Sequence, residues 1–277
     1  MNNKIELIDQ LFKHIKIDCS KCFGFCCVAL YFSKLDGFPA DKVAGCPCKH
    51  LQSDFGCDIH SELRNKGLKG CTSYDCFGAG QKIAQITYRG KSWISSPKLA
   101  KQMYEAFLVM RQLHEMLWYL TEAVTLENIV SIKESLQSMI EEIKQMTLLK
   151  PEAILEIDIE SHRTQVNILL KEAYKLNRQD KKSIQKTSFE KMLIGKDLRK
   201  VNLKEADLSG AMMIAANLKE CDLSGALLIG VDMRDADIRG ANLSKSIFLT
   251  QTQINTAKGN QFTKLPSRLD RPSYWEK

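Results

Sequence analysis

The sequence predicts a multidomain α+β protein with three parts, and three observations support this division. Nine of the ten cysteines lie between Cys19 and Cys76, a long central stretch follows helical periodicity, and the last part repeats every five residues. The 277 residues also exceed the usual size of one domain. We expect a loop-rich cysteine domain over residues 1–95, a helical domain with a linker over 96–190, and a repeat domain with a C-terminal cap over 191–277.

The composition is that of an ordinary globular chain with dispersed charge. Hydrophobic residues make up 44%, and the net charge of +7 is divided as +4 over residues 1–94, zero over 95–195 and +3 over 196–277. A nucleic-acid binder concentrates its basic residues, so this pattern argues against such a partner. The N-terminus carries Glu6 and Asp9 without the apolar core of an export signal, and no apolar run is long enough for a membrane span. We expect a cytoplasmic protein.

The cysteine spacing indicates a soft metal. In a reducing compartment closely spaced thiols bind zinc or an iron–sulfur cluster more readily than they form disulfides. Frequent glycines break up this segment, so it buries little apolar surface and needs cross-links or metal. Cys19 and Cys22 supply two thiolates from one turn. The side chains of the adjacent Cys26 and Cys27 are expected to diverge, so the pair serves two metals or one of them is a spare.

The motif Cys-x2-Cys-x3-Cys-Cys at Cys19 to Cys27 resembles a bacterial cysteine-rich domain described as zinc- or iron-chelating. The usual pattern has two residues before the cysteine pair, whereas this chain has three, and both zinc and an iron–sulfur cluster stay open. The segments 57–64 and 70–81 are similar to a subgroup that also carries pentapeptide repeats. The resemblance implies a metal-binding domain and favours Cys48 over Cys46 as a ligand. The predicted metal ligands are Cys19, Cys22, Cys26, Cys27, Cys48, Cys57, Cys71 and Cys76.

Other polar residues of this region have simpler interpretations. His60 is an alternative metal ligand, but a lone histidine beside a cysteine cluster is more often a surface or hydrogen-bonding group. The segment Gly78-Ala-Gly80 lacks the preceding strand and following lysine of a phosphate loop, and we interpret it as a tight turn after the last cysteine. His114 and His162 are expected to be structural or exposed.

The central part predicts three amphipathic helices. A short helix over residues 3–16 precedes the cysteines, and residues 83–88 are expected to form a short strand. Ser96 and Pro97 then suit an N-cap and first helical position. Apolar residues at helical spacing continue to Leu120, and further helices are expected over 126–146 and 151–176. They predict an antiparallel bundle, or a helical hairpin that forms a homodimer. The lysine-rich stretch 178–191 is interpreted as a solvated linker.

From Lys196 the chain contains eleven five-residue repeats with a large central residue and a small residue two positions earlier. This pattern resembles the pentapeptide-repeat family, which implies a right-handed quadrilateral β-helix whose central residues fill the interior. Residues 252–275 resemble the closing segment of that family. Cys221 occupies a small inward position and is expected to pack there. The central residues are Leu198, Leu203, Leu208, Met213, Leu218, Leu223, Leu228, Met233, Ile238, Leu243 and Phe248.

The leading functional hypothesis is a metal-binding scaffold whose β-helix face contacts a protein partner. A first alternative is a cluster-dependent modifying enzyme or a redox sensor that uses Cys26 or Cys27. No methyl-donor site, Walker loop or Ser-His-Asp set is visible, so whether the chain is an enzyme is left open. A second alternative follows from pentapeptide-repeat proteins that protect DNA gyrase by imitating DNA. The charge of +3 on residues 196–277 has the wrong sign for that mimicry.

Overall fold

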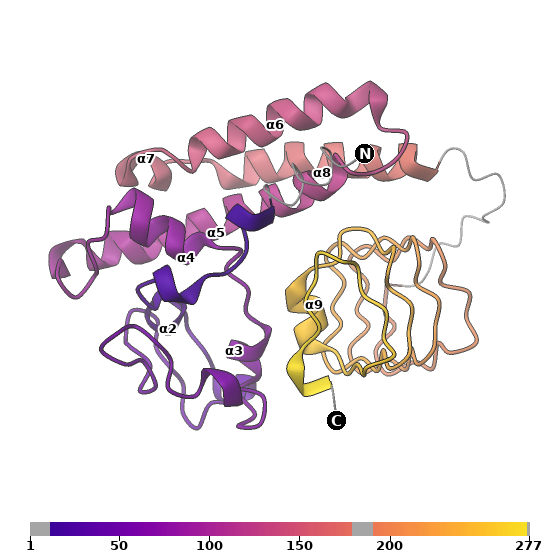
Figure 1. Cartoon of the computed structure of the whole chain (residues 1–277), viewed down its shortest axis with the longest axis horizontal. Helices are drawn as coiled ribbons and strands as arrows, with labels where there is room; N and C mark the ends of the chain where they lie inside the picture. Colours follow the sequence, from indigo (N-terminus) through magenta and orange to yellow (C-terminus); the bar gives the residue numbers. More distant parts are fainter. Residues whose placement is uncertain (1–11, 179–190, 276–277) are drawn as a thin grey trace. The chain divides into compact units, whose positions relative to one another are not determined.

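The computed structural model describes residues 12–178 and 191–275. Its contacts divide the chain into two compact units, one within residues 1–71 and 75–177 and the other within 72–74 and 178–277 (Figure 1). Most of the helix expected over 3–16 and most of the linker expected over 178–191 lie outside the described residues. The three-part domain division stays a prediction.

The cysteine-rich part of the first unit is a series of short helical turns joined by loops. No element there exceeds five residues, in agreement with the expected loop-rich segment. The elements are the 3-10 turns η1 (Cys19–Lys21), η2 (Lys34–Asp36) and η3 (His60–Glu62), the helices α2 (Phe25–Ala29), α3 (Lys69–Ser73) and α4 (Ala79–Lys82), and the π-turn η4 (Ile83–Thr87).

A small apolar cluster organises these loops. Phe32 and Phe38 stack with their ring centroids 4.9 Å apart, and Ile59 and Leu68 complete the cluster. Gly37 has a φ of 89°, and a Cβ there would lie 1.7 Å from the carbonyl oxygen of Gly67, so only glycine allows this approach. The cluster therefore fixes loops that are distant in sequence, including those that carry two of the cysteines.

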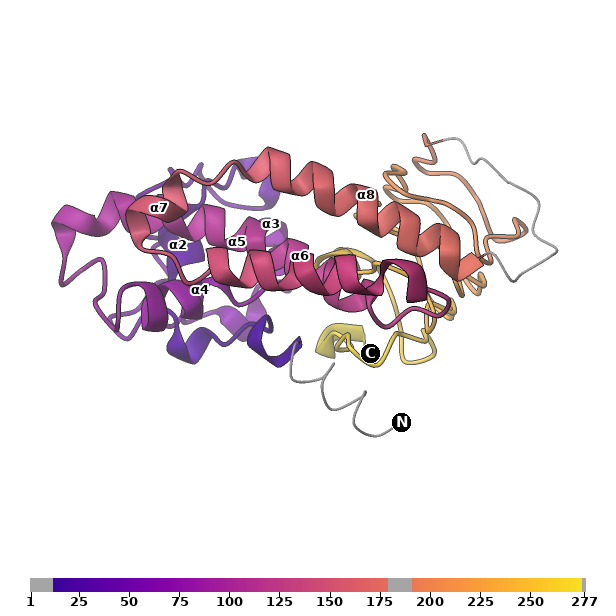
Figure 2. The ribbon, with the colours of Figure 1, turned by 90° about the horizontal axis from the view of Figure 1, so that it is seen from above.

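The longest helix, α5 (Ala100–Ala123), packs against α2, α4, α6 and α7. The Phe25 and Phe107 rings stack 5.5 Å apart, and Trp93 donates from Nε1 to the carbonyl oxygen of Phe23 at 2.8 Å. Because α5 buries residues toward both the cysteine loops and the other helices, these two parts form one unit. Figure 2 shows α5 and α6 running side by side, with α7 and α8 beside them.

The three helices expected in the central part are present, but some of their boundaries differ from the prediction. The 3-10 turn η5 (Pro97–Leu99) has Ser96 at its N-cap position and leads into α5. The second helix is η6 (Val130–Ile132) followed by α6 (Lys133–Met146), which begins later than expected. The third is interrupted after α7 (Pro151–Leu155) and resumes as α8 (Ile159–Arg178).

The strand expected over 83–88 is wrong, because this stretch continues α4 as the π-turn η4. The backbone N–H of Tyr88 donates to the carbonyl oxygen of Ile83, and the neighbouring residues Ile83 and Ala84 are both buried. A strand would direct consecutive side chains to opposite faces. Contact with α5 is what decides between the two conformations.

The predicted α+β class and the right-handed quadrilateral β-helix are also wrong. The parts of the chain that the structure describes contain no β-strand or sheet and are helix-rich with loops. In the repeat segment only single residues pair, in isolated parallel bridges such as Asp197 with Asn217 and Asp222 with Asn242. The physical reason lies in the short repeat: after each bridging residue the chain turns, so no run of paired residues becomes long enough for a strand.

The repeat segment instead forms stacked loops, drawn from orange to yellow in Figure 1. Bridged residues in the repeats are 20 positions apart, or four repeats. All eleven predicted central residues are buried, and Cys221 is buried and donates its S–H to the carbonyl oxygen of Leu198. The register and the packing role of Cys221 are therefore confirmed. Leu193 is buried in the same way, so the pattern begins one repeat before Lys196.

Asp and Asn side chains shape the turns of the repeats. Each precedes a buried central residue and accepts a hydrogen bond from the backbone N–H two residues later, which is an Asx turn. The fifth residue of many repeats then takes a positive φ, as Gly210 does at 66° and Gly225 at 71°. The Asx residues are Asp197, Asn202, Asp207, Asn217, Asp222, Asp232, Asp237 and Asn242.

A short helix follows the last repeat. Thr250 and Gln253 form a capping box at the start of α9 (Gln251–Thr256). Gln253 also donates to the carbonyl oxygens of Leu228 and Val231 at 2.7 and 3.0 Å. The final turn η7 (Ser273–Trp275) places the Trp275 ring against Gly259. These contacts bind the segment after the repeats to the last loops of the stack.

Candidate functional site

The eight predicted ligands come from six separate parts of the first unit, and many of their thiols influence one another's pKa. Cys19 lies in η1, Cys26 and Cys27 lie in α2, and Cys71 lies in α3. The backbones of Cys57 and Leu51 form an isolated antiparallel β-bridge. Cys57 and Cys71 both pack against the apolar cluster of Phe32, Phe38, Ile59 and Leu68. All ten cysteines of the chain are free thiols.

A tight turn presents Cys19 and Cys22. Asp18 accepts hydrogen bonds from the backbone N–H and the hydroxyl of Ser20 at 3.2 and 2.5 Å, and the Cys22 N–H donates to the Cys19 carbonyl oxygen at 3.2 Å. The Cys22 sulfur accepts backbone N–H groups of Phe25 and Gly24. Burial nevertheless raises the pKa of Cys22 to about 12. Backbone N–H groups directed at sulfur favour the thiolate that a metal requires.

Gly80 places the last cysteine beside this turn. A Cβ at Gly80 would lie 2.5 Å from the Cys22 sulfur, so the glycine lets α4 approach Cys22 closely. The Cys76 sulfur accepts backbone N–H groups of Gly78 and Gly80. Burial is the main cause that raises the pKa of Cys76 to about 11. Gly78 has a φ of 76° and opens α4, so the interpretation of this segment as a turn after Cys76 is confirmed.

The neighbouring Cys26 and Cys27 sulfurs lie 3.9 Å apart. At this distance the two thiols are in hydrogen-bond contact. The expected divergence of the two side chains is therefore wrong. Cys26 donates its S–H to Cys27, which raises the pKa of Cys26 and lowers that of Cys27.

On the other side of Cys27 lie three more of the predicted ligands. The backbone N–H of Cys48 donates to the carbonyl oxygen of Cys27 at 2.9 Å. Burial raises the pKa of Cys71 to about 12, and the nearby Cys27, Cys48 and Cys57 thiols raise it further. Burial also raises the pKa of Cys57, again with contributions from Cys27 and Cys48. These four thiols therefore lie within electrostatic reach of one another.

Grouped by which thiols raise one another's pKa, the eight cysteines can be described as two sets that meet at the Cys26–Cys27 dipeptide. Cys26 interacts with Cys22 and Cys76, and Cys22 interacts with Cys19 and Cys76. Cys19 also lies within electrostatic reach of Cys27 and Cys57. We call Cys19, Cys22, Cys26 and Cys76 the Cys76 set. We call Cys27, Cys48, Cys57 and Cys71 the Cys71 set.

Lys42 lies beside the two sets, and its role was not predicted. Its ammonium donates to the carbonyl oxygens of Val28 and Leu30 at the end of α2. Burial lowers its pKa, whereas the surrounding thiols, with Cys48 and Cys27 foremost, raise it. A fixed cation at this position offsets negative charge on thiolates. In the sequence, nothing marked Lys42 except its position between two groups of cysteines.

The donor chemistry suits a soft metal, but the sulfurs do not converge on one point. Among the described residues, no three His, Cys, Asp or Glu side chains are arranged around a common ion position. His60 is exposed in η3, and Cys46 is exposed as well. His50, which the sequence did not single out, lies 3.0 Å from Asp58 through Nδ1.

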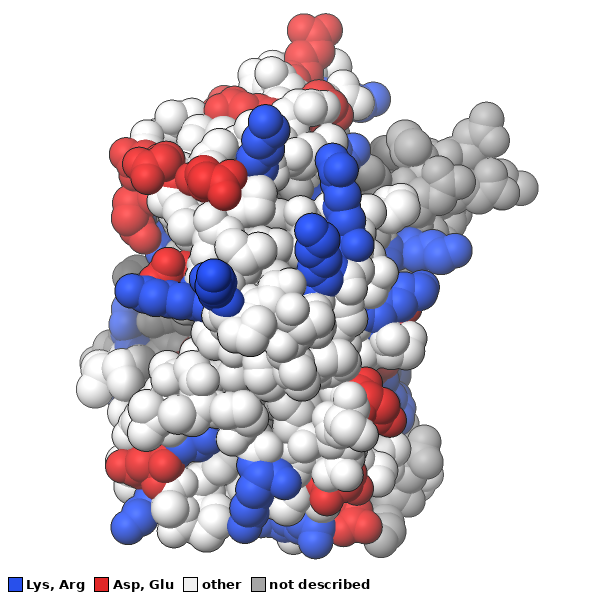
Figure 3. All heavy atoms as spheres, turned by 90° about the vertical axis from the view of Figure 1, so that its left-hand side faces the viewer, with Lys and Arg blue, Asp and Glu red and all other residues white. Residues whose placement is uncertain are grey.

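Charged side chains of both signs occur on the face shown in Figure 3, with uncharged surface between them. Within the described ranges, no helix is both long and apolar enough to cross a bilayer.

Two comparisons relate this chain to known proteins. The family model described as pentapeptide repeats matches residues 192–219 and 216–248 with eight copies. "Uncharacterized protein YybG" of Bacillus subtilis (strain 168) is 46% identical over 279 residues, covering all of both chains, so the similarity includes the cysteine-rich unit. No solved structure matches the chain. The chain therefore belongs to the same family as YybG and is a pentapeptide-repeat protein.

Proposed function

We propose that this pentapeptide-repeat protein is a cytoplasmic scaffold that binds zinc or an iron–sulfur cluster through its clustered thiols. The observation that carries the proposal is the gathering of eight free cysteines from six parts of one unit. Cysteines scattered over 58 positions, from Cys19 to Cys76, lie within electrostatic reach of one another without forming disulfides.

Metal would resolve an electrostatic conflict among these thiols. Burial disfavours the charged thiolate, and neighbouring thiolates repel one another. Both effects raise the pKa values of Cys22, Cys71 and Cys76, burial more than the neighbouring cysteines. A divalent ion reverses this repulsion because it binds the deprotonated form. The backbone N–H groups directed at Cys22 and Cys76, together with the Lys42 ammonium, would stabilise the resulting negative charge.

Each set would supply one centre with four thiolates. Zinc in structural sites is bound by four tetrahedral ligands, and iron–sulfur clusters are also held by four cysteines. The adjacent Cys26 and Cys27 would then serve different centres, which was one of the alternatives that their spacing left open. Closing each set requires side-chain rotation, because the sulfurs do not converge on one point in the structure.

The experiment is metal analysis and absorption spectroscopy of the anaerobically purified full chain. We expect about two zinc ions per chain, or iron with sulfide and a visible absorption band. Cys76→Ala and Cys71→Ala should each remove the metal of one set only. Cys221→Ala is the matched control, since Cys221 packs inside the repeat stack. A folded, metal-free protein with freely titrating thiols would refute the proposal.

A redox role is the second candidate, and the Cys26–Cys27 pair favours it. Cys27 has a lowered pKa because it accepts the S–H of Cys26 and lies near Lys42. Thiolate character increases reactivity toward oxidants. Mild peroxide treatment followed by peptide mass spectrometry would test this role. Oxidation at Cys27 before the other cysteines, in metal-free protein, supports it, and uniform oxidation contradicts it.

For the protein partner we propose the exposed apolar side chains at the start of the repeat stack. Met192 and Met212 lie in one bridge and are 58% and 37% exposed. Exposed apolar residues on neighbouring loops favour association, with a second copy as the simplest partner. Light scattering of the wild type and of Met192→Asp would test this. A dimer that the substitution dissociates supports self-association, and a wild-type monomer contradicts it.

A further inference from the structure

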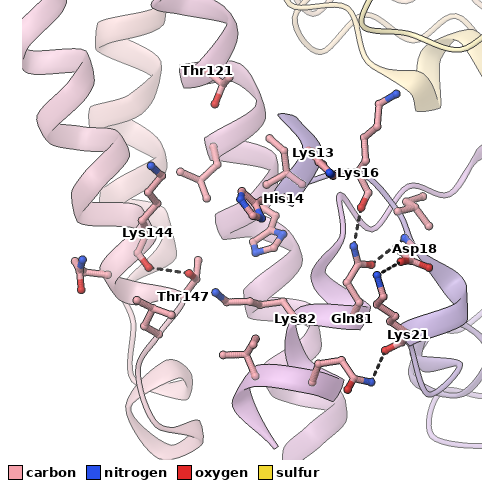
Figure 4. A pocket seen from close by; sticks show the side chains of 18 of the residues that line it. Lys13, His14, Lys16, Asp18, Lys21, Gln81, Lys82, Thr121, Lys144 and Thr147 are labelled. Atoms are coloured by element: carbon pink, nitrogen blue, oxygen red, sulfur yellow. Dashed lines mark hydrogen bonds and ion pairs between the residues drawn. The ribbon is translucent and has the colours of Figure 1, made fainter. Parts of the chain in front are cut away.

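A second feature of the first unit, separate from the thiols, is a cavity of about 840 Å³. Its walls are residues 13–18 with Lys21, α4 with η4, α5, and α6 with the two residues that follow Met146 (Figure 4). Ligand pockets usually measure about 300–1,000 Å³, so the size suits a small organic molecule. Apolar lining comes from Ile15, Ile17, Ile86, Leu117 and Leu148.

The wall formed by residues 13–18 and Lys21 is held to α4 and η4 by two glutamine side chains. Gln81 donates to the Lys16 carbonyl oxygen at 2.7 Å and accepts the Asp18 N–H at 3.0 Å. Gln85 donates to the Lys21 carbonyl oxygen at 2.9 Å. These bonds hold the lysine-bearing segment in place, as Figure 4 shows for Gln81. The cavity is therefore a built feature and does not depend on a loose surface loop.

Cations outnumber anions around the cavity. Of its acidic side chains, Asp18 is already paired with Lys21 at 2.8 Å, and Glu141 accepts from Gln145 at 2.6 Å. The electrostatic potential inside is therefore positive and favours negatively charged ligands. The basic lining residues are Lys13, Lys16, Lys21, Lys82 and Lys144, and the acidic ones are Asp18 and Glu141.

Lys82 is a half-buried cation of the cavity that has no counter-charge among the described residues. It is half-buried and extends toward Thr147 in Figure 4, and no described residue forms an ion pair or hydrogen bond with its ammonium. Burial lowers its pKa. A partly buried charge without a partner is unfavourable unless a ligand completes it.

Two hydrogen-bond acceptors line the same cavity. His114 is buried and donates from Nδ1 to the Phe77 carbonyl oxygen at 2.7 Å, so its Nε2 carries a lone pair. Thr147 donates its hydroxyl to the Lys144 carbonyl oxygen at 2.7 Å, which leaves its oxygen able to accept. A cation beside two acceptors matches a ligand that carries an oxyanion and a hydroxyl group.

We propose that this cavity binds a small hydroxylated anion, a phosphate ester or a hydroxycarboxylate, whose oxyanion pairs with Lys82 and whose hydroxyl donates to His114 or Thr147. The shared chemistry is a negatively charged oxygen group next to a hydroxyl. The cavity and its lining do not include any of the eight cysteines, so the proposal is independent of metal binding.

The test is calorimetric titration of the full chain with glycerol 3-phosphate and with malate, which distinguish the phosphate from the carboxylate source. Succinate, which lacks the hydroxyl, should bind more weakly than malate. Lys82→Met should weaken binding by about tenfold or more, because it removes the pairing charge. Lys98→Met is the matched control: Lys98 is exposed and outside the cavity, and its loss should change affinity by less than about twofold.

A second measurement needs no variant. Bound ligand should slow acetylation of Lys82 by an amine-reactive reagent and leave Lys98 unchanged, as read by peptide mass spectrometry. Saturable binding with protection of Lys82 supports the proposal. It is overturned if neither glycerol 3-phosphate nor malate binds at millimolar concentration, or if Lys82→Met binds as tightly as Lys98→Met. Equal affinity for malate and succinate would overturn the assignment of the two acceptors.

Discussion

His114 in α5 donates from Nδ1 to the carbonyl oxygen of Phe77 at a distance of 2.7 Å. Phe77 follows Cys76 directly and has a φ of 50°, and its N–H donates to Asp75 Oδ1 at 2.6 Å. Both polar groups of this buried residue are therefore held by side chains. Through this bond the long helix positions the loop that carries the last of the clustered cysteines, and His114 also lines the cavity.

Replacing His114 with leucine should destabilise the first unit. The substitution keeps most of the volume but leaves the buried Phe77 carbonyl oxygen without its donor, which costs about 1–3 kcal/mol. Urea denaturation followed by tryptophan fluorescence would measure the loss. His60→Leu is the control, because His60 is exposed and its replacement should change stability by less than about 0.5 kcal/mol. Equal stability of His114→Leu and wild type would contradict a role for this bond.

The contribution of His114 should also depend on pH. Burial, with a smaller effect of the Lys82 charge, lowers the pKa of His114 to about 4 from a usual 6.5. Between these values the unfolded chain binds a proton that the folded chain does not, so stability falls as pH decreases from about 6.5 toward 4. The advantage of wild type over His114→Leu in free energy of unfolding should therefore be largest above pH 7 and smaller near pH 5.

Asp75 has the opposite effect on how stability depends on pH, but it is present in both wild type and His114→Leu. Its burial raises the pKa of its carboxyl to about 6, so the folded state binds that proton first and acidification from about 6 toward 3.8 is stabilising at this group. Its effect should largely cancel when the two proteins are compared at the same pH. A gap between wild type and His114→Leu that does not change with pH would contradict the neutral, buried imidazole.

Gly80→Ala should disturb the Cys76 set through one contact. The added Cβ would lie 2.5 Å from the Cys22 sulfur, closer than such atoms approach, although the helical backbone of Gly80 would otherwise accept alanine. We expect lower thermal stability and, for the metal-bound form proposed above, loss of metal from the Cys76 set with the Cys71 set retained. The double variant Cys22→Ala/Gly80→Ala removes the opposing sulfur. If Gly80→Ala is as destabilising in that background as in wild type, the proposed clash is not the cause.

Periodicity predicted well those features that depend on short segments. The five-residue pattern correctly assigned the inward positions from Leu198 to Phe248, because each repeat places its central residue in the same environment. It did not predict the secondary structure, since a bridge of one residue per repeat, as at Asp197, is too short for a strand. The apolar residues around Ile83 were compatible with either a strand or a helix, and packing on α5 decided for the helix.

Features that depend on contacts between distant segments could not be predicted. The cysteines were identified as a group, but the proposed division into two sets depends on how α2, α3 and α4 approach one another. The contact of Gly80 with Cys22 joins residues 58 positions apart, and nothing local to either residue indicates it. Lys42, Lys82 and His114 were ordinary side chains in the sequence. Their importance comes from the carbonyl groups, thiols and cavity beside them.

The repeat stack offers a prediction that separates its packing from that of the helical unit. Leu208 is fully buried at a central position, and Leu208→Ala should cost about 2–5 kcal/mol because it leaves a cavity that the stacked loops cannot close. Cys221→Ala should have little effect, because alanine occupies the same position at Ala206, Ala211 and Ala216. The pair compares a large inward residue with a small one in the same register.

Hydrogen exchange read by mass spectrometry is the suitable measurement, because a chain of two units need not unfold in one step. In Leu208→Ala, amides that bridge neighbouring loops, such as the Leu208 N–H to the Leu227 carbonyl oxygen at 3.1 Å, should exchange faster than in wild type. Peptides from α5 should be unchanged, because α5 belongs to the first unit. Faster exchange in Cys221→Ala than in Leu208→Ala would contradict the assignment of the large residue as the one that fills the interior.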